Sequence, residues 1–166
     1  MTELSSSKVE TLFRKTLEVL ETSTFAPPLE TEKELAYTQR VVLPFISQWI
    51  ATLNENGLHV RGDGGLNPLR LVWDEISLFP DVTVMNFQER LISFEVKFLR
   101  NEDPGGSLTK GIGQTFMYEK AGFKASVGII IDCRKIIRSH NALKYSERMQ
   151  LSERAVAYVF KPLIVV

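Results

Sequence analysis

The stretch Pro80–Lys97, "PDVTVMNFQERLISFEVK", decides the fold, because two runs of strand-forming residues lie on either side of a polar turn. Alternating apolar residues in both runs predict a β-hairpin packed on a core, with its turn centred near Phe87–Gln88. Residues whose numbers sum to about 176 then lie opposite one another, which places Asp81 across from Glu95. A half-buried hairpin that carries these carboxylates, and Lys97 beside them, needs an explanation.

The charged residues of this hairpin are expected to share one face. Side chains alternate along a strand, so Glu95 and Lys97 project together while Phe94, Val96 and Phe98 point to the core. Two like charges directly across a ladder cost a few tenths to about 1 kcal/mol. A divalent cation between the carboxylates removes that repulsion, and Mg²⁺ favours sites with one or two carboxylates plus phosphate oxygens. The lysine would then hold or deprotonate a water molecule.

Length and composition favour one α/β domain over residues 1–166, since the 166-residue chain is 44% hydrophobic and too short for two comfortable domains. The single Cys133 has no partner for an internal disulfide or a CxxC motif, which fits a reducing cytoplasm. The stretch MTELSSSKVETLF has no apolar centre, and no run approaches the length of a membrane span. We therefore expect a soluble cytoplasmic protein with no membrane partner.

Charge is distributed unevenly although the formal net charge is zero. Residues 1–89 hold 7 Lys and Arg against 13 Asp and Glu, whereas residues 90–148 hold 11 against 6. Such asymmetry suggests a surface that faces a polyanion. Ordinary solvated charges explain the same numbers, and the sequence leaves both readings open.

Capping boxes at Ser7 and at Thr31 predict two helices before the hairpin, and Pro44 is expected to kink the second one. Periodicity and turn composition predict the remaining elements. The expected elements are helices over 8–21 and from 31 to about 56, a loop over 61–68, a strand over Leu69–Ile76, a loop over 101–107, a helix over Lys110–Ala121, a buried parallel strand over Ala125–Ile131, a polar helix near 138–154 and a strand over Ala155–Val166.

With these residues in place, the sequence resembles the PD-(D/E)xK nuclease superfamily. The match is literal at Pro80-Asp81 and at Glu95-Val96-Lys97, with 13 residues between the acids. Gln114 and Tyr118, on the following helix, resemble the Q-xxx-Y motif of the RecB-like branch. The resemblance implies an α/β fold with a restriction-endonuclease-like core: a central mixed β-sheet flanked by helices, in αβββαβ order, with an extra N-terminal helix and a C-terminal helix-strand extension.

The resemblance also implies roles for the residues of the hairpin. Asp81 and Glu95 resemble the metal-binding carboxylates, and the backbone carbonyl of Val96 resembles a frequent third ligand. Lys97 resembles the amine that positions or activates the attacking water. The implied cofactor is Mg²⁺, with Mn²⁺ able to substitute.

Three further residues enter through the resemblance, each with a structural alternative. The superfamily often adds a glutamate from the first core helix, for which Glu34 is the best candidate, with Glu30 and Glu32 close behind. Glu34 is also the N3 residue expected of the Thr31 capping box. Gln114 and Tyr118 would reach the same ligand or support the lysine, or else form a helix surface pair and a half-buried aromatic.

Other residue types with reactive chemistry carry little signal. His59 and His140 are isolated from other metal-ligand residues, so each is expected to be structural. The loop RGDGG lacks the Lys-Ser/Thr of a P-loop and does not match GxGxxG. Cys133 has no histidine nearby in sequence and is expected to be packed rather than nucleophilic.

Two functions from different classes follow. The first is a Mg²⁺-dependent nuclease, endo- or exonucleolytic, that hydrolyses phosphodiester bonds of nucleic acid, with DNA as the expected substrate. The second is a catalytically weak or inactive module of the same fold that binds nucleic acid or a protein partner. A homodimer is compatible with either function.

Overall fold

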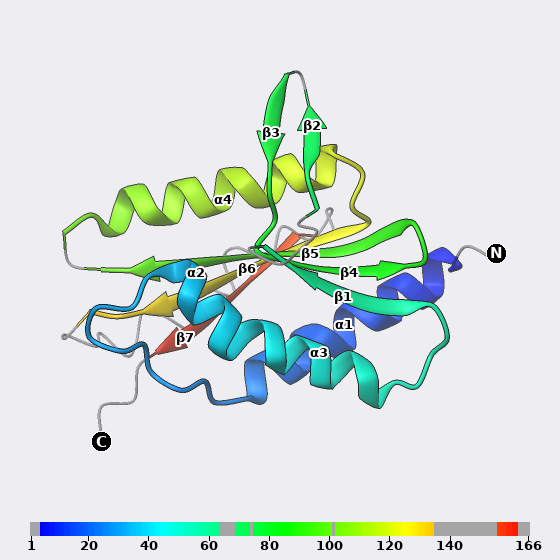
Figure 1. Cartoon of the computed structure of the whole chain (residues 1–166), viewed down its shortest axis with the longest axis horizontal. Coiled ribbons are helices and arrows are strands. Elements are labelled where there is room, and N and C mark those ends of the chain that lie inside the picture. The colour runs from blue at the N-terminus through cyan, green and yellow to red at the C-terminus, as the bar shows by residue number, and fades with distance from the viewer. Residues whose placement is uncertain (1–3, 64–68, 74, 101, 135–155, 163–166) are drawn as a thin grey trace.

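A mixed five-stranded β-sheet forms the centre of the computed structural model, which describes residues 4–63, 69–73, 75–100, 102–134 and 156–162 (Figure 1). The strands lie in the order β1-β4-β5-β6-β7, and β2 and β3 form a separate pair. The elements are α1 (Ser6–Thr22), α2 (Glu34–Tyr37), the π-helical turn η1 (Thr38–Val42), α3 (Leu43–Thr52), β1 (Leu58–Gly62), β2 (Leu71–Trp73), β3 (Ile76–Leu78), β4 (Val82–Asn86), β5 (Glu89–Leu99), α4 (Pro104–Lys120), β6 (Ala125–Asp132) and β7 (Val156–Pro162).

Strands β4 and β5 form the expected hairpin. Val82 pairs with Phe94 and Val84 with Ile92, which confirms the predicted register along the body of the hairpin. The register shifts by one residue after Val84, toward the turn at Phe87, where the backbone adopts a positive φ of 51°. The hairpin that decided the fold class is therefore present, with one bulge that periodicity did not predict.

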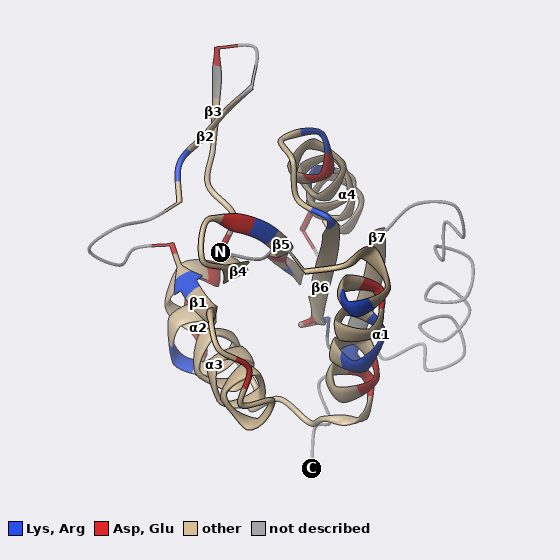
Figure 2. Ribbon diagram, turned by 90° about the vertical axis from the view of Figure 1, so that its right-hand side faces the viewer, with Lys and Arg blue, Asp and Glu red and all other residues tan. Residues whose placement is uncertain are grey.

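The expectation that this hairpin is half-buried is wrong. Strand β5 pairs antiparallel with β4 and parallel with β6, so it lies inside the sheet. Helices α1 and α3 lie on one side of the sheet and α4 on the other (Figure 2). Phe94, Val96 and Phe98 enter the main core as predicted, but Glu95 and Lys97 on the opposite face are also only 1% and 8% exposed.

Both predicted capping boxes are wrong in detail. The N-cap of α1 is Ser5, whose side chain makes no capping hydrogen bond, and Ser7 lies inside the helix. The N-cap of α2 is Lys33, so Glu34 is the first helical residue rather than the third. The Glu34 carboxylate instead accepts a hydrogen bond from the backbone N–H of Phe98, 64 residues away. A tertiary contact thus replaces the local cap that the sequence pattern suggested.

Pro44 lies at the start of α3, directly after the π-helical turn η1. Proline has no N–H, and its ring crowds the carbonyl four residues before it. The wider turn of a π-helix provides room for the ring. The expected kink stays a prediction. Helix α3 then ends at Thr52, earlier than the predicted end near residue 56.

Two segments before the hairpin differ from expectation. Strand β1 was not predicted, and it pairs antiparallel with β4 at the edge of the sheet. The single strand expected over Leu69–Ile76 is instead divided between β2 and β3, which form a short hairpin that stands out from the sheet (Figure 1). We refer to this β2–β3 hairpin as the arm. Glu75 at its tip has a positive φ of 65°, which reverses the chain where periodicity predicted continuation.

Helix α4 begins earlier than predicted. The segment 101–107 was expected to be a loop, but Pro104 occupies the first turn of the helix and the Asp103 side chain accepts a hydrogen bond from the N–H of Gly106 at 2.9 Å. Proline suits this position because its missing N–H would have no helical partner there. The two glycines that indicated a loop are instead part of the first helical turn.

The C-terminal strands agree with expectation. Strand β6 is fully buried and parallel to β5, and β7 is parallel to β6. The polar helix predicted near 138–154 lies outside the described residues, as do residues 163–166 of the last predicted strand. Figure 2 shows both acidic and basic residues on α1 and on α4, so a surface that faces a polyanion stays a prediction.

The N-cap of α4 generates a stability prediction. Asp103→Ala removes the acceptor for the N–H of Gly106 and should lower the free energy of unfolding by about 1 kcal/mol, measured by urea denaturation. Asp103→Asn keeps a side-chain oxygen at the cap, so its free energy of unfolding should fall much less than that of Asp103→Ala. Equal losses in the two variants would contradict the capping role.

Candidate active site

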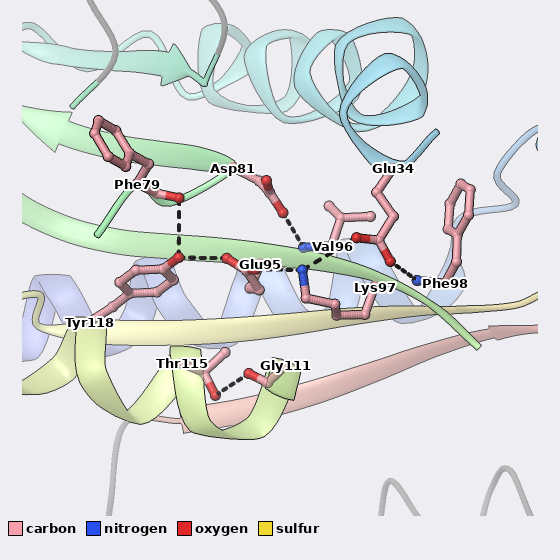
Figure 3. A network of polar contacts seen from close by, with 10 residues as sticks. All are labelled: Glu34, Phe79, Asp81, Glu95, Val96, Lys97, Phe98, Gly111, Thr115 and Tyr118. Atoms are coloured by element: carbon pink, nitrogen blue, oxygen red, sulfur yellow. Dashed lines mark hydrogen bonds and ion pairs between the residues drawn. The ribbon is translucent and has the colours of Figure 1, made fainter. Parts of the chain in front are cut away.

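The polar cluster of this protein forms where β5 extends past its neighbour. Strand β4 begins opposite Phe94, and β5 continues five residues further. Two backbone N–H groups on that uncovered edge donate to carboxylates instead of to a strand (Figure 3). Val96 donates to Oδ2 of Asp81 at 2.7 Å, and Phe98 donates to Oε1 of Glu34 at 2.8 Å. The acids therefore complete the hydrogen bonding of a strand edge that β4 leaves open.

Glu95 lies at the centre of the cluster, and both of its oxygens are occupied. Oε1 lies 2.7 Å from Nζ of Lys97, and Oε2 accepts a hydrogen bond of 2.6 Å from the hydroxyl of Tyr118. The Lys97 ammonium also lies 3.4 Å from Oε2 of Glu34, and the Tyr118 hydroxyl lies 3.2 Å from the carbonyl of Phe79. Lys97 of β5 and Tyr118 of α4 thus contact the Glu95 carboxylate directly, and they link it to Glu34 of α2 and to Phe79 after β3 (Figure 3).

The electrostatics of the cluster follow from three carboxylates around one ammonium. Burial, helped by the charge of Glu95, raises the pKa of Asp81 to about 7. Burial likewise raises the pKa of Glu95, although Lys97 and Tyr118 oppose that rise. Burial disfavours the charge on Lys97, but Glu95, Glu34 and Asp81 outweigh it and raise the lysine pKa. Lys97 is therefore an ammonium at neutral pH in the metal-free protein.

Gly111 of α4 supports the position of Lys97. A Cβ at residue 111 would lie 2.8 Å from Cγ of Lys97, so only glycine lets the lysine stem pass this close to the helix. Sequence reasoning did not single out Gly111, which is the second residue of the helix predicted over Lys110–Ala121 and is an interior glycine only because α4 begins at Pro104. Such a glycine often marks a close approach between elements.

The structure brings together Asp81, Glu95, Val96, Lys97, Glu34 and Tyr118. Tyr118 contacts the carboxylate of Glu95. From the sequence we had expected it to reach the same ligand as Gln114 or to support Lys97. Gln114 lies one turn earlier on α4. Burial, with the charge of Glu95, raises the pKa of the Tyr118 hydroxyl, and the Gln114 side chain opposes that rise. Its Oε1 is buried and has no hydrogen-bond partner among the described residues.

The other two candidate glutamates lie outside this cluster. Glu30 is exposed, and Glu32 accepts hydrogen bonds from Arg40 at 2.6 and 2.7 Å. Glu32 also accepts from the N–H of Leu29, and its pKa is lowered chiefly by the Arg40 guanidinium. Glu32 thus stabilises the segment before α2, and Glu34 is the glutamate of the three that reaches β5.

His59 and Cys133 do not join the cluster. His59 lies on the edge strand β1, with Nδ1 at 3.1 Å from the carbonyl of Gly57, and His140 lies outside the described residues. Burial raises the pKa of the Cys133 thiol to about 11. The thiol is therefore protonated at neutral pH, in agreement with the expectation that it is not a nucleophile.

A metal ion would find hard oxygen donors in this cluster. In the described part of the chain, no three Asp, Glu, His or Cys side chains are already grouped as a metal site. Half-buried Asp81 and buried Glu95 instead provide two neighbouring carboxylates whose mutual repulsion a cation would relieve. The Val96 carbonyl points to the same strand edge as its N–H, which faces Asp81. Two carboxylates, a backbone oxygen and substrate oxygens form a donor set that fits Mg²⁺.

Comparisons with known proteins identify no relative: no protein-family model, no curated protein and no solved structure matches this chain. The described helices include none long and apolar enough to cross a membrane.

The raised pKa of Asp81 predicts how stability depends on pH. Below about pH 4 the carboxyl is protonated in both the folded and the unfolded chain; as pH rises toward 7, only the unfolded chain loses the proton, so folding is progressively disfavoured. Asp81→Asn keeps an acceptor for Val96 but carries no charge. In divalent-free buffer the free energy of unfolding of this variant should exceed that of wild type by near zero at pH 4 and by a few kcal/mol at pH 8. Each unit of difference between the folded and unfolded pKa of Asp81 corresponds to about 1.4 kcal/mol.

Urea denaturation of both proteins across this pH range measures that difference. Glu34, Glu95 and Lys97 face Asp81 in both proteins, so their own titration contributes to both curves. An Asp81→Asn protein that is less stable than wild type at pH 8 would show that the carboxylate is not repelled there.

Two glycines on α4 give a matched test of the contact with Lys97. A Cβ at Gly113 meets nothing within 4 Å, so Gly113→Ala should raise the free energy of unfolding by up to about 1 kcal/mol through helix propensity. Gly111→Ala gains the same propensity but displaces Lys97 from Glu95, so it should gain nothing or lose stability. Urea denaturation compares the two variants, and an equal gain would mean that Lys97 moves at no cost.

Proposed function

We propose that this chain is a metal-dependent nuclease that hydrolyses phosphodiester bonds of nucleic acid, with DNA as the expected substrate. One observation carries the proposal: Asp81, Glu95 and Lys97, the residues of the PD-(D/E)xK pattern, meet in one cluster in which Glu95 and Lys97 are buried and Asp81 is half-buried. Glu34 from the first core helix joins them, as the resemblance implies for that helix. A purely structural strand would gain little from burying this much charge.

The order of the elements supports the finer assignment to a restriction-endonuclease-like core. Helices α2 and α3 precede the three antiparallel strands β1, β4 and β5 of the sheet, with the arm inserted between β1 and β4; α4 and the parallel strand β6 follow. This is the αβββαβ order that the resemblance implies. Helix α1 corresponds to the extra N-terminal helix, and β7 belongs to the C-terminal extension.

In this proposal Asp81 and Glu95 hold Mg²⁺, or Mn²⁺ in its place, with the Val96 carbonyl and Glu34 as further oxygen ligands. The cation supplies charge that stabilises the transition state and lowers the pKa of the attacking water. Tyr118 fixes the orientation of Glu95 through its 2.6 Å hydrogen bond. The chain therefore contributes both the ligands and the group that orients one of them.

Lys97 acts as a charged donor rather than as a base in this proposal. Its raised pKa keeps it protonated in the metal-free protein, and its ammonium already lies 2.7 Å from Glu95. An ammonium at that place donates to the attacking water or to a phosphate oxygen and attracts the developing negative charge. This refines the expectation that the amine either holds or deprotonates the water.

The same contacts support the alternative of a weak or inactive module. Lys97 and Tyr118 already occupy both oxygens of Glu95, and the described residues contain no preformed group of three ligand side chains. A chain that keeps this arrangement in the presence of Mg²⁺ would bind nucleic acid or a protein partner without cutting. Metal binding therefore separates the two functions.

The proposal predicts metal-dependent cleavage that depends on Lys97. Labelled single- and double-stranded DNA and RNA should be cut in Mg²⁺ or Mn²⁺ and left intact in EDTA. Under single-turnover conditions Lys97→Ala should lower the cleavage rate by about a hundredfold or more, the usual scale for a lost proton-transfer or charge-stabilising group. Substrate affinity, measured in Ca²⁺, should change little.

Lys124→Ala is the matched control, because Lys124 is half-exposed and its nearest carboxylate oxygen, on Glu89, lies 3.8 Å away. Titration calorimetry with Mn²⁺ should show binding to wild type and weaker binding to Asp81→Asn. Absence of Mn²⁺ binding together with absence of cleavage would reject the nuclease and leave the binding module.

A further inference from the structure

The arm presents an exposed face that the cluster does not use. In the arm, Leu71 pairs with Leu78 and Val72 with Ser77. Leu71 and Leu78 are buried against Tyr118, whereas Val72 is 65% exposed and Ser77 is exposed on the opposite side. The arm therefore has one face anchored on the protein and one face open.

The open face combines an aromatic ring with a guanidinium. Continuing the register by one pair places Arg70 opposite Phe79, and the alternation of side chains puts both on the face of Val72 and Ser77. Arg70 donates hydrogen bonds to Oγ of Ser77 from Nε at 3.1 Å and from Nη2 at 2.9 Å, which holds it on this face. Phe79 is 40% exposed.

This face adjoins the cluster. The carbonyl of Phe79 accepts a hydrogen bond from Tyr118, the residue that holds Glu95, and Asp81 follows two positions later in the chain. Figure 3 shows Phe79 beside Asp81 with its ring directed away from the Tyr118 hydroxyl. A group bound on the ring would lie at the border of the proposed site.

We propose that Arg70 and Phe79 form a nucleotide platform, which binds an unpaired nucleotide of a single-stranded substrate. This inference rests on the proposed function, since it names the substrate class of the same site. The face of an exposed aromatic ring stacks on any base, and arginine attracts the neighbouring phosphate. A paired base inside a duplex does not present its face to such a ring. Glu75 at the tip of the arm repels phosphate, so the platform is confined to the base of the arm.

The test measures binding of a fluorescein-labelled single-stranded oligonucleotide and of a duplex of equal length, in Ca²⁺. Phe79→Ala should weaken single-strand binding about tenfold, the scale of one lost stacking contact, and should leave duplex binding unchanged. Phe79→Trp should restore single-strand affinity. The matched control is Phe87→Ala, since Phe87 is equally exposed (43%) but lies in the turn of the β4–β5 hairpin.

Arg70 gives a second, independent readout. Arg70→Gln should reduce the slope of log affinity against log salt concentration by about 0.7, the value for one phosphate contact on a single strand. Arg14→Gln, an exposed arginine on α1, should leave the slope unchanged.

The outcomes separate this inference from the proposed function. Equal losses from Phe79→Ala and Phe87→Ala, an equal loss for duplex and single strand, or no nucleic-acid binding by wild type would overturn the platform. Metal-dependent cleavage with no effect of Phe79→Ala would reject the platform and keep the nuclease. Single-strand binding that depends on Phe79 without any cleavage would keep the platform and reject the nuclease.

Discussion

The site depends on how the backbone N–H groups of β5 find acceptors where β5 extends beyond the first residue of β4. A buried backbone N–H without a partner costs about 1–3 kcal/mol, and a hydrogen bond to a charged acceptor stabilises by about 1.5–3 kcal/mol. Here the acceptors are the side chains of Asp81 and Glu34, which approach from the segment before β4 and from the start of α2. The same two bonds that satisfy the sheet edge thus fix two carboxylates in position, so the geometry of the proposed site follows from backbone hydrogen bonding.

That solution leaves an excess of negative charge in a region of low solvent exposure. Glu95, Asp81 and Glu34 surround one ammonium, and burial raises the pKa of both Asp81 and Glu95. Lys97 and Tyr118 offset part of this cost, and replacing buried ion pairs by apolar side chains is often neutral or stabilising. These charges therefore contribute little to stability by themselves, which is why we propose a ligand that compensates them.

The sequence predicted the parts of the fold that local pattern controls. Strand alternation placed Phe94 and Glu95 on opposite faces of the hairpin, and the continuous apolar run of β6 indicated a buried parallel strand, both as observed. The role of Glu34 at β5 was obscured because a local capping pattern competed with a hydrogen bond to a residue 64 positions away. Gly111 was missed for the same kind of reason, since its close approach to Lys97 arises only when α4 packs on β5. Short-range sequence patterns thus identified Asp81, Glu95 and Lys97, whereas the contacts that support them are seen only in the tertiary structure.

Tyr118 connects the two regions that we assign to catalysis and to substrate binding. Its hydroxyl contacts both the Glu95 carboxylate and the Phe79 carbonyl, and its ring packs with the buried leucines of the arm. A displacement of the arm would therefore change the hydrogen bond that orients Glu95, because one hydroxyl group serves both neighbours. Helix α4 carries both Gly111, which leaves room for the stem of Lys97, and Tyr118, which contacts Glu95 and packs with the arm. The packing of α4 on the sheet thus supports Lys97, Glu95 and the proposed platform, while Asp81 and Glu34 are held by the backbone of β5.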